Sequence, residues 1–220
     1  MSKKALIDFY FDIISPYSYI GFEAMLRYKS VLPVEVKFKP FFVAGVMAAS
    51  GNTSPAYNKP KERYSRNDIQ KMNEYWGLNL SFPEGYITNF MRYGSLLPQR
   101  FLTAVEQKQP DYLVEAARAF SRRIFVEHLP VHTIDDVEKV GLRIKLPEIG
   151  KILEFSQTPE IKDLLKERTN EALESGAFGA PWIILKQEGK KDSVFFGGDR
   201  FPLICSELGI DFKGPLKSTL

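Results

Sequence analysis

Apolar and polar positions follow a period of two in two short runs near the start of the chain. Residues 5–11, ALIDFYF, are mainly apolar and aromatic, and residues 34–42 alternate Val34, Val36 and Phe38 with charged side chains. Both patterns are typical of β-strands. The stretch between them is long enough for about one helix. We therefore predict a β-α-β unit, in which a right-handed crossover joins two parallel strands.

Helical spacing dominates the second half of the chain. Between residues 97 and 144, apolar residues recur every three or four positions, which predicts a block of helices. A further long helix is predicted after Thr158, which suits the N-cap, with Pro159 at the first helical position and Gly176 as the stop. Residues 46–98 are rich in Gly, Asn, Pro, Tyr and Lys and show little periodicity, so we expect loops carrying short helices there.

The last part of the chain predicts a hairpin and one more helix. Residues 181–186, PWIILK, and 193–198, SVFFGG, read as strands joined by a polar turn. Such a pair is typical of an antiparallel hairpin. A short helix is expected over residues 201–208.

In chain order the elements read β-α-β, a helical insert, then α-β-β-α. This is the thioredoxin order interrupted once, so we predict an α/β protein with a thioredoxin-like fold and a large inserted helical domain, as in DsbA-like proteins. The thioredoxin-like domain is expected over residues 1–45 and 175–220, with a preceding helix from about residue 158. The inserted helical domain is expected over residues 46–157.

Composition narrows the classes of function. The 220 residues are 44% hydrophobic and 13% aromatic, enough for a large core without covalent cross-links. A single cysteine, Cys205, excludes an intramolecular disulfide and a Cys-rich zinc site. The net charge of +3 argues against a nucleic-acid partner. No apolar run approaches the roughly 20 residues of a membrane span. His128 and His132 have zinc-ligand spacing, but Pro130 separates them and no general-base Glu accompanies them, so we expect no metal.

The stretch DIISPYSYIGFEAM, residues 12–25, places Ser15 where the first predicted strand meets the first helix. The simplest interpretation is an N-cap, because Ser followed by Pro16 is an ordinary way to begin a helix. In a thioredoxin-like fold, however, the reactive group occupies this position. The pattern alone leaves both interpretations open.

Five motifs, in order, carry a resemblance to a known family. They are SPYSYIGFEAMLRY (15–28), SGNTSP (50–55), SLLPQRFLTAV (95–105), SGAFGAPW (175–182) and FFGGDRF (195–201). This set resembles the kappa-class glutathione transferases, whose fold is similar to that of the DsbA-like oxidoreductases with a serine motif in place of the dithiol. The resemblance covers nearly the whole chain.

The resemblance implies a site for glutathione as co-substrate, with no cofactor. Ser15 would be catalytic, donating its hydroxyl to the thiolate. Pro181 is expected to be cis, with Ala180 pairing with the peptide backbone. Where the family often has a serine this chain has Gly198, which leaves the backbone N–H groups of the turn as donors. The implied glutathione-binding residues are Pro16, Tyr17, Asn52, Lys61, Tyr64, Asp68, Ala180, Pro181, Gly198, Asp199 and Arg200.

Three functions follow as alternatives. The leading one is conjugation of glutathione to small apolar electrophiles in detoxification, with reduction of organic hydroperoxides as an additional activity. The second is a glutathione-dependent isomerase resembling 2-hydroxychromene-2-carboxylate isomerase, and the third is a redox-inactive binding or assembly module. The family resemblance also implies a homodimer and a peroxisomal or mitochondrial location, and the C-terminal Ser218, Thr219 and Leu220 resemble a degenerate peroxisomal signal.

Overall fold

The computed structural model describes residues 4–217, apart from the side chain of Asn89. Four strands in this part of the chain form one sheet in the order β2-β1-β3-β4. They are β1 (Ala5–Phe11), β2 (Val34–Pro40), β3 (Trp182–Lys186) and β4 (Ser193–Phe196). β1 pairs parallel with β2 and antiparallel with β3, and β3 pairs antiparallel with β4. The predicted parallel pair and closing hairpin are confirmed, and this strand order is that of the predicted thioredoxin-like fold.

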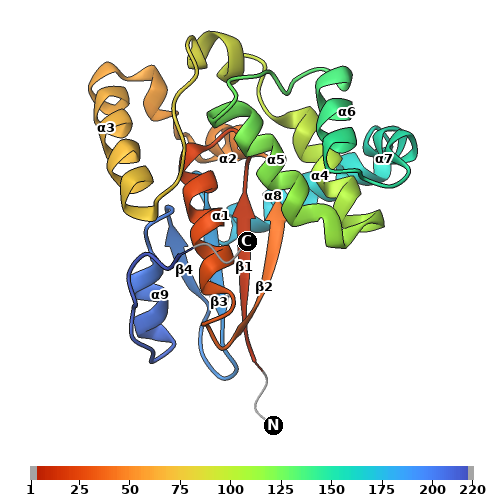
Figure 1. Ribbon diagram of the computed structural model, residues 1–220. Coiled ribbons are helices and arrows are strands. Elements are labelled where there is room, and N and C mark those ends of the chain that lie inside the picture. Colours follow the sequence, from red (N-terminus) through yellow and green to blue (C-terminus); the bar gives the residue numbers. More distant parts are fainter. Residues whose placement is uncertain (1–3, 218–220) are drawn as a thin grey trace.

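Alternating side chains of the sheet pack against helices on its two faces. Ile7 and Phe9 of β1 belong to the larger core cluster, together with residues of α1 (Pro16–Tyr28) and α9 (Phe201–Glu207). Tyr10 points the other way, into the cluster that includes Ala172 of α8 (Pro159–Glu174). Figure 1 shows α1 lying along the sheet, with α9 beside it. The end of β1 and the start of α1 are therefore fixed from both faces.

Helices fill the segment between β2 and α8. Figure 1 shows α4, α5, α6 and α7 grouped on the β2 side of the sheet, and α3 on the other side, near α9. The predicted block of helices is confirmed. Its members and neighbours are α2 (Val43–Ser50), α3 (Lys59–Trp76), α4 (Leu96–Lys108), α5 (Leu113–Phe125), α6 (Ile134–Arg143) and α7 (Ile149–Ser156), with short 3-10 helices at Pro55–Tyr57 and Pro110–Tyr112 and a π-helix at Tyr86–Met91.

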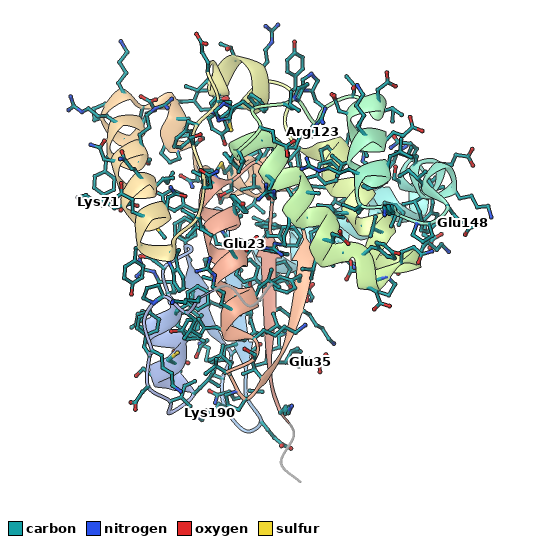
Figure 2. The ribbon with its side chains drawn as sticks, viewed as in Figure 1. Glu23, Glu35, Lys71, Arg123, Glu148 and Lys190 are labelled. Atoms are coloured by element: carbon teal, nitrogen blue, oxygen red, sulfur yellow. The ribbon has the colours of Figure 1, made fainter. Side chains whose placement is uncertain are left out.

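Helix α3 corrects the expectation of loops with short helices over residues 46–98. It is 18 residues long, begins after the N-cap Asn58 and ends at Gly77, which has a left-handed backbone. Within the helix only Ile69 and Trp76 are buried, so the sequence carries no apolar stripe. Its outer face is exposed, as Lys71 shows in Figure 2. The capping residues Asn58 and Gly77 mark the two ends of this helix better than its apolar residues do.

Hydrogen bonds from α1 connect the C-terminal end of α3 with the segment that follows α9. Arg27 of α1 donates to the carbonyl oxygens of Trp76 (2.6 Å) and Leu216 (2.8 Å), and the Tyr28 hydroxyl donates to that of Gly214 (2.7 Å). These bonds join α1, the end of α3 and the C-terminal segment.

The long helix before β3, α8, also forms as predicted, although the Thr158 hydroxyl donates to the Phe155 carbonyl (2.8 Å) instead of capping the helix. Among residues 4–217, no helix has the length and apolar character that crossing a membrane requires.

Candidate active site

Ser15 lies at the junction of β1 and α1 and caps the helix. Its Oγ accepts the backbone N–H of Ser18 (3.1 Å) and donates to the carbonyl oxygen of Ala180 (3.2 Å). Pro16 follows at the first helical position, where its missing N–H costs nothing. The hydroxyl thus joins two segments that are 165 residues apart in sequence.

The loop before β3 lies against this helix start. The Ala180–Pro181 peptide bond is cis, as predicted. Gly21 of α1 faces this loop: a Cβ on Gly21 would lie 3.3 Å from Pro181 Cγ and 3.0 Å from Gly198 Cα. The absence of a side chain at Gly21 therefore lets both this loop and the turn after β4, which contains Gly198, approach α1 closely.

The turn after β4 approaches α1 even more closely. A Cβ on Gly198 would lie 2.6 Å from the Tyr17 carbonyl oxygen and 3.0 Å from the Gly21 nitrogen, both backbone atoms. A serine at this position would direct its side chain into α1. The next two residues, Asp199 and Arg200, form an ion pair with two hydrogen bonds of 2.9 and 2.7 Å.

A cavity of about 540 Å³ opens in front of Ser15, between the start of α1, α2, α3, the π-helix and the turn after β4. Ten of the twelve predicted site residues line it. Pro181 and Gly198 do not line it; they pack behind it, against Gly21. The ten are Ser15, Pro16, Tyr17, Asn52, Lys61, Tyr64, Asp68, Ala180, Asp199 and Arg200.

Helix α3 forms the opposite wall of the cavity. The Tyr17 hydroxyl donates to Asp68 Oδ2 (2.9 Å), which links α1 to α3, and burial raises the pKa of this phenol above its ordinary value. Tyr64 is 69% exposed, and Lys61 lies one turn before it. Asn52, from the loop after α2, donates its amide to the Phe178 carbonyl oxygen (2.7 Å).

The basic groups of the cavity differ in their partners. Arg66 pairs with Glu62, and Arg200 pairs with Asp199. Among the described residues, Lys61 has no carboxylate partner. Its ammonium group is therefore the basic group of this cavity that is ready to take an anion.

Apolar side chains cover the rest of the cavity. They come from α2, from the segment around the π-helix and from the edge of the sheet. Phe82 and Tyr86 both line the cavity, although Tyr86 is itself buried and donates its hydroxyl to the Ile14 carbonyl oxygen. The additional apolar residues are Val43, Met47, Ile69, Met72, Ile87, Met91, Phe178 and Phe196.

Asp12 lies behind the cavity wall and connects three of its residues. It was not identified from the sequence. It is fully buried and accepts the N–H groups of Ile14 (3.1 Å) and Val43 (3.0 Å) and the hydroxyl of Ser95 (2.7 Å). All three donors belong to residues that line the cavity. Burial raises the pKa of this carboxyl to about 6, against the opposing effect of its hydrogen bonds. Asp12 thus holds three parts of the wall together.

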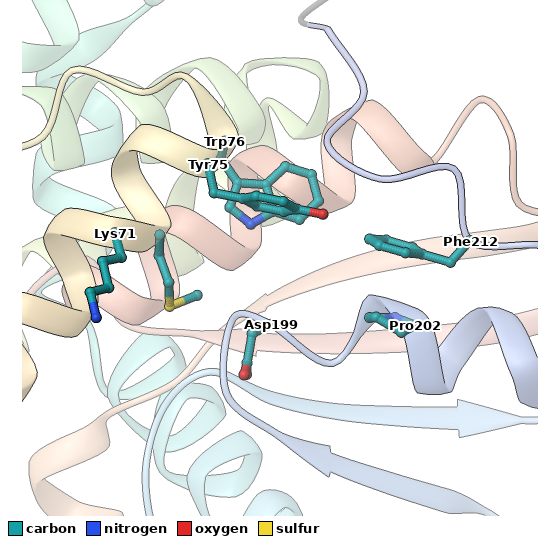
Figure 3. Close-up of a pocket in the computed structure, with 7 residues that line it drawn as sticks. Lys71, Tyr75, Trp76, Asp199, Pro202 and Phe212 are labelled. Atoms are coloured by element: carbon teal, nitrogen blue, oxygen red, sulfur yellow. The ribbon is translucent and has the colours of Figure 1, made fainter.

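A smaller cavity of about 360 Å³ adjoins the first between α3, α9 and the C-terminal segment. Figure 3 shows Tyr75 and Trp76 on one side, Phe212 and Pro202 on another, and Asp199 at its edge. Asp199 and Met72 line both cavities. Lys71 belongs to the smaller one alone.

The remaining reactive side chains lie elsewhere. His128 bonds to Ser81 (3.0 Å), and His132 stacks on Tyr93. No cluster of potential metal ligands occurs among the described residues. Cys205 is buried in the core.

Comparison with known proteins gives consistent matches over nearly the whole chain. The DSBA-like thioredoxin domain family matches residues 6–209. Glutathione S-transferase kappa 2 of Caenorhabditis elegans is 34% identical over 219 residues, covering 99% of this chain and 97% of the relative. Glutathione S-transferase kappa 1 of Homo sapiens is 31% identical, covering 96% and 93%. The solved 2-hydroxychromene-2-carboxylate isomerase has a TM-score of 0.73 at 20% identity and covers 93% of this chain and 94% of its own.

Proposed function

The chain belongs to the DSBA-like thioredoxin domain family and, within it, to the kappa glutathione S-transferases, and from this premise we propose that Ser15 stabilises the glutathione thiolate for attack on small apolar electrophiles. One observation carries the proposal. The Ser15 hydroxyl stands at the start of α1, faces the cis Ala180–Pro181 loop and opens into a cavity with a largely apolar lining.

The physical basis is the stabilisation of an anion. A thiol has an ordinary pKa of about 8.5, so only a few per cent is ionised at neutral pH. Orphan N–H groups and the partial positive charge at a helix start favour a thiolate there. A hydroxyl that donates to this thiolate adds roughly 1.5 to 3 kcal/mol, or about one to two pKa units.

The two ends of glutathione find complementary groups on opposite walls of the cavity. We assign one carboxylate to Lys61, because its ammonium group has no carboxylate partner among the described residues. The γ-glutamyl end goes to the turn at Asp199 and Arg200, with the backbone N–H group of Asp199 as a donor and the Asp199 carboxylate for the ammonium; Gly198, which packs behind the cavity, is left out of this assignment. Tyr64, Asp68 and Asn52 complete the peptide site, and Ala180 pairs with the cysteinyl backbone.

The apolar part of the cavity, around Met47, Ile87 and Met91, is assigned to the electrophile. In the reaction the thiolate sulfur forms a bond to the electrophilic carbon, and the leaving group departs with its electron pair. The thiol proton goes to solvent. With an organic hydroperoxide, two glutathione molecules would give the disulfide, an alcohol and water, so that both electrons come from glutathione.

Conjugation with 1-chloro-2,4-dinitrobenzene, an activated aryl halide, tests this proposal. Wild-type protein should consume one thiol for each thioether formed. Ser15→Ala should lose roughly tenfold or more of its turnover at about pH 6.5, and the loss should narrow near pH 9, where glutathione ionises unaided.

Ser54→Ala is the matched control, because Ser54 also lines the cavity and caps a helix, with Oγ accepting the Ala56 N–H (3.3 Å). It should keep nearly full turnover. A deficit of Ser15→Ala that is constant with pH contradicts thiolate stabilisation. Turnover of a chromene carboxylate without thiol consumption would favour the isomerase, and binding of glutathione without either reaction would favour a binding module.

We further propose a homodimer and a peroxisomal or mitochondrial location, both on the family resemblance. Light scattering that finds only particles of monomer mass at micromolar concentration would contradict the dimer. Ser218, Thr219 and Leu220, on which the peroxisomal proposal depends, lie outside the described residues. Removing these three residues from a fluorescent fusion should abolish a peroxisomal pattern, whereas a mitochondrial pattern in both forms would contradict their role.

A further inference from the structure

The hydrogen bonds of Ser15 show that its single proton is already in use. Its Oγ accepts the Ser18 N–H, which fixes the oxygen at the helix start, and its O–H donates to the Ala180 carbonyl oxygen. A hydroxyl has one proton and donates one strong hydrogen bond at a time. To donate to a sulfur in the cavity, Ser15 must therefore withdraw its proton from Ala180.

That withdrawal affects an acceptor in the cavity wall. Ala180 lines the cavity and is 7% exposed as a residue, and among the described residues the Ser15 hydroxyl is the one donor to its carbonyl oxygen. Once a bound thiol excludes water from this part of the wall, a carbonyl oxygen left without a donor carries a desolvation penalty. This penalty opposes rotation of the hydroxyl toward a bound thiol. A second donor that reaches the Ala180 oxygen would remove the penalty.

Glutathione carries such a donor close to its sulfur. In the hydrogen-bonded register of an antiparallel pair, two facing residues exchange both N–H···O bonds. A cysteinyl residue paired with Ala180 would therefore direct its own amide N–H at the Ala180 carbonyl oxygen, while its thiol faces Ser15. Binding of the peptide backbone and release of the serine proton would then be one event.

We propose that the cysteinyl amide N–H of the thiol substrate replaces the Ser15 hydroxyl at the Ala180 carbonyl and so releases that hydroxyl to donate to the thiolate. This inference rests on the proposed function and makes it more specific. It selects thiols that carry an amide N–H on the carbon next to the CH₂–SH group, that is, cysteinyl peptides. Simple thiols of similar acidity are bound without this release and are activated less.

The test uses two thiols that differ in that one group. The first is glutathione, and the second is its ester analogue, in which oxygen replaces the N–H between the γ-glutamyl and cysteinyl residues. Ultraviolet thiolate absorbance gives each pKa, free and bound, at concentrations that saturate wild-type protein and Ser15→Ala. The measured quantity is the lowering of the thiol pKa on binding, so that the different acidities of the free thiols cancel.

We expect wild-type protein to lower the pKa of glutathione about one unit more than that of the ester. In Ser15→Ala no hydroxyl is released, so the two thiols should be lowered equally. Equal lowering of both thiols by wild-type protein, together with a smaller lowering in Ser15→Ala, overturns the inference and leaves the proposed function standing. A lowering of the glutathione pKa that is as large in Ser15→Ala as in wild-type protein overturns both.

Discussion

The two walls of the cavity are built in different ways. The wall with Ser15 and Ala180 is fixed by the hydrogen bond between them and by the buried Asp12, and Gly198 of the turn after β4 packs against the backbone of α1. The α3 wall presents exposed side chains from a helix that buries only Ile69 and Trp76. Under the proposed function the difference separates two tasks: the Ser15 wall holds the reacting sulfur and the γ-glutamyl end, whereas α3, a less embedded element, holds only the other end of the substrate. Substitutions in the first wall should therefore cost stability or chemistry, and those in the second should change affinity.

The largest effect is expected from Asp12, which lies beneath the wall that contains Ser15. Its pKa rises from the ordinary 3.8 to about 6 in the folded protein, so the native state binds the proton more tightly than the unfolded chain between these values. The ionised carboxylate consequently costs stability that the protonated form does not. Relative to Asp12→Asn, wild-type protein should lose on the order of 3 kcal/mol of unfolding free energy as pH rises from about 3.5 to 7.

Urea unfolding of both proteins at several pH values measures this difference. Tyr86 is the titratable neighbour to consider, because Asp12 acts on its phenol, and that phenol stays protonated throughout the range. If the stability difference between wild-type protein and Asp12→Asn does not change between these pH values, the pKa of Asp12 is not raised in the folded protein. Such a result would also weaken the contrast between the two walls.

The next largest effect is expected from Gly198. A Cβ there meets backbone atoms of Tyr17 and Gly21, which cannot rotate away. Gly198→Ser, although it supplies the residue frequent in the family, should cost about 1 to 3 kcal/mol of stability and raise the KM for glutathione. Gly150→Ala is the control, since no atom lies within 4 Å of a Cβ at that position. A Gly198→Ser protein with wild-type stability and a lower KM would contradict the close approach.

The smallest effect belongs to the α3 wall. Lys61→Met keeps the length of the side chain and removes the charge, and it should raise the KM for glutathione about three- to fivefold without changing kcat. The exposed position makes this difference shrink at high salt. Lys71→Met, on the same helix but lining only the smaller cavity, should leave KM unchanged. A fall in kcat for Lys61→Met would place Lys61 in the chemistry.

Much of the fold was predictable because its signals are local. The alternation at Val34, Val36 and Phe38 marks a strand, and the predicted parallel pair of β1 and β2 and hairpin of β3 and β4 are both confirmed. Helix α3 escaped prediction since a helix with two buried residues has no apolar stripe. Whether residues 46–157 form a domain of their own stays a prediction.

The motifs named residues that the structure brings around one cavity, whereas the connections between these residues were not predictable from the sequence. Ser15 and Ala180 stood out through the family resemblance, yet the bond between them joins residues 165 positions apart. Asp12 lies in the same short stretch as Ser15, but its importance comes from partners at positions 14, 43 and 95, which only the fold brings together. Likewise, the tight packing of Gly198 depends on how closely α1 approaches the turn.

The central claim is that Ser15 acts on the sulfur of bound glutathione and does more than cap α1. Titration of the ultraviolet thiolate absorbance of the glutathione complex, in wild-type protein, Ser15→Ala and Ser54→Ala, tests it directly. We predict that the thiol pKa in Ser15→Ala lies roughly one to two units above that in wild-type protein, while Ser54→Ala titrates like wild type. Superimposable titrations of wild-type protein and Ser15→Ala would contradict the claim and leave Ser15 as a helix cap.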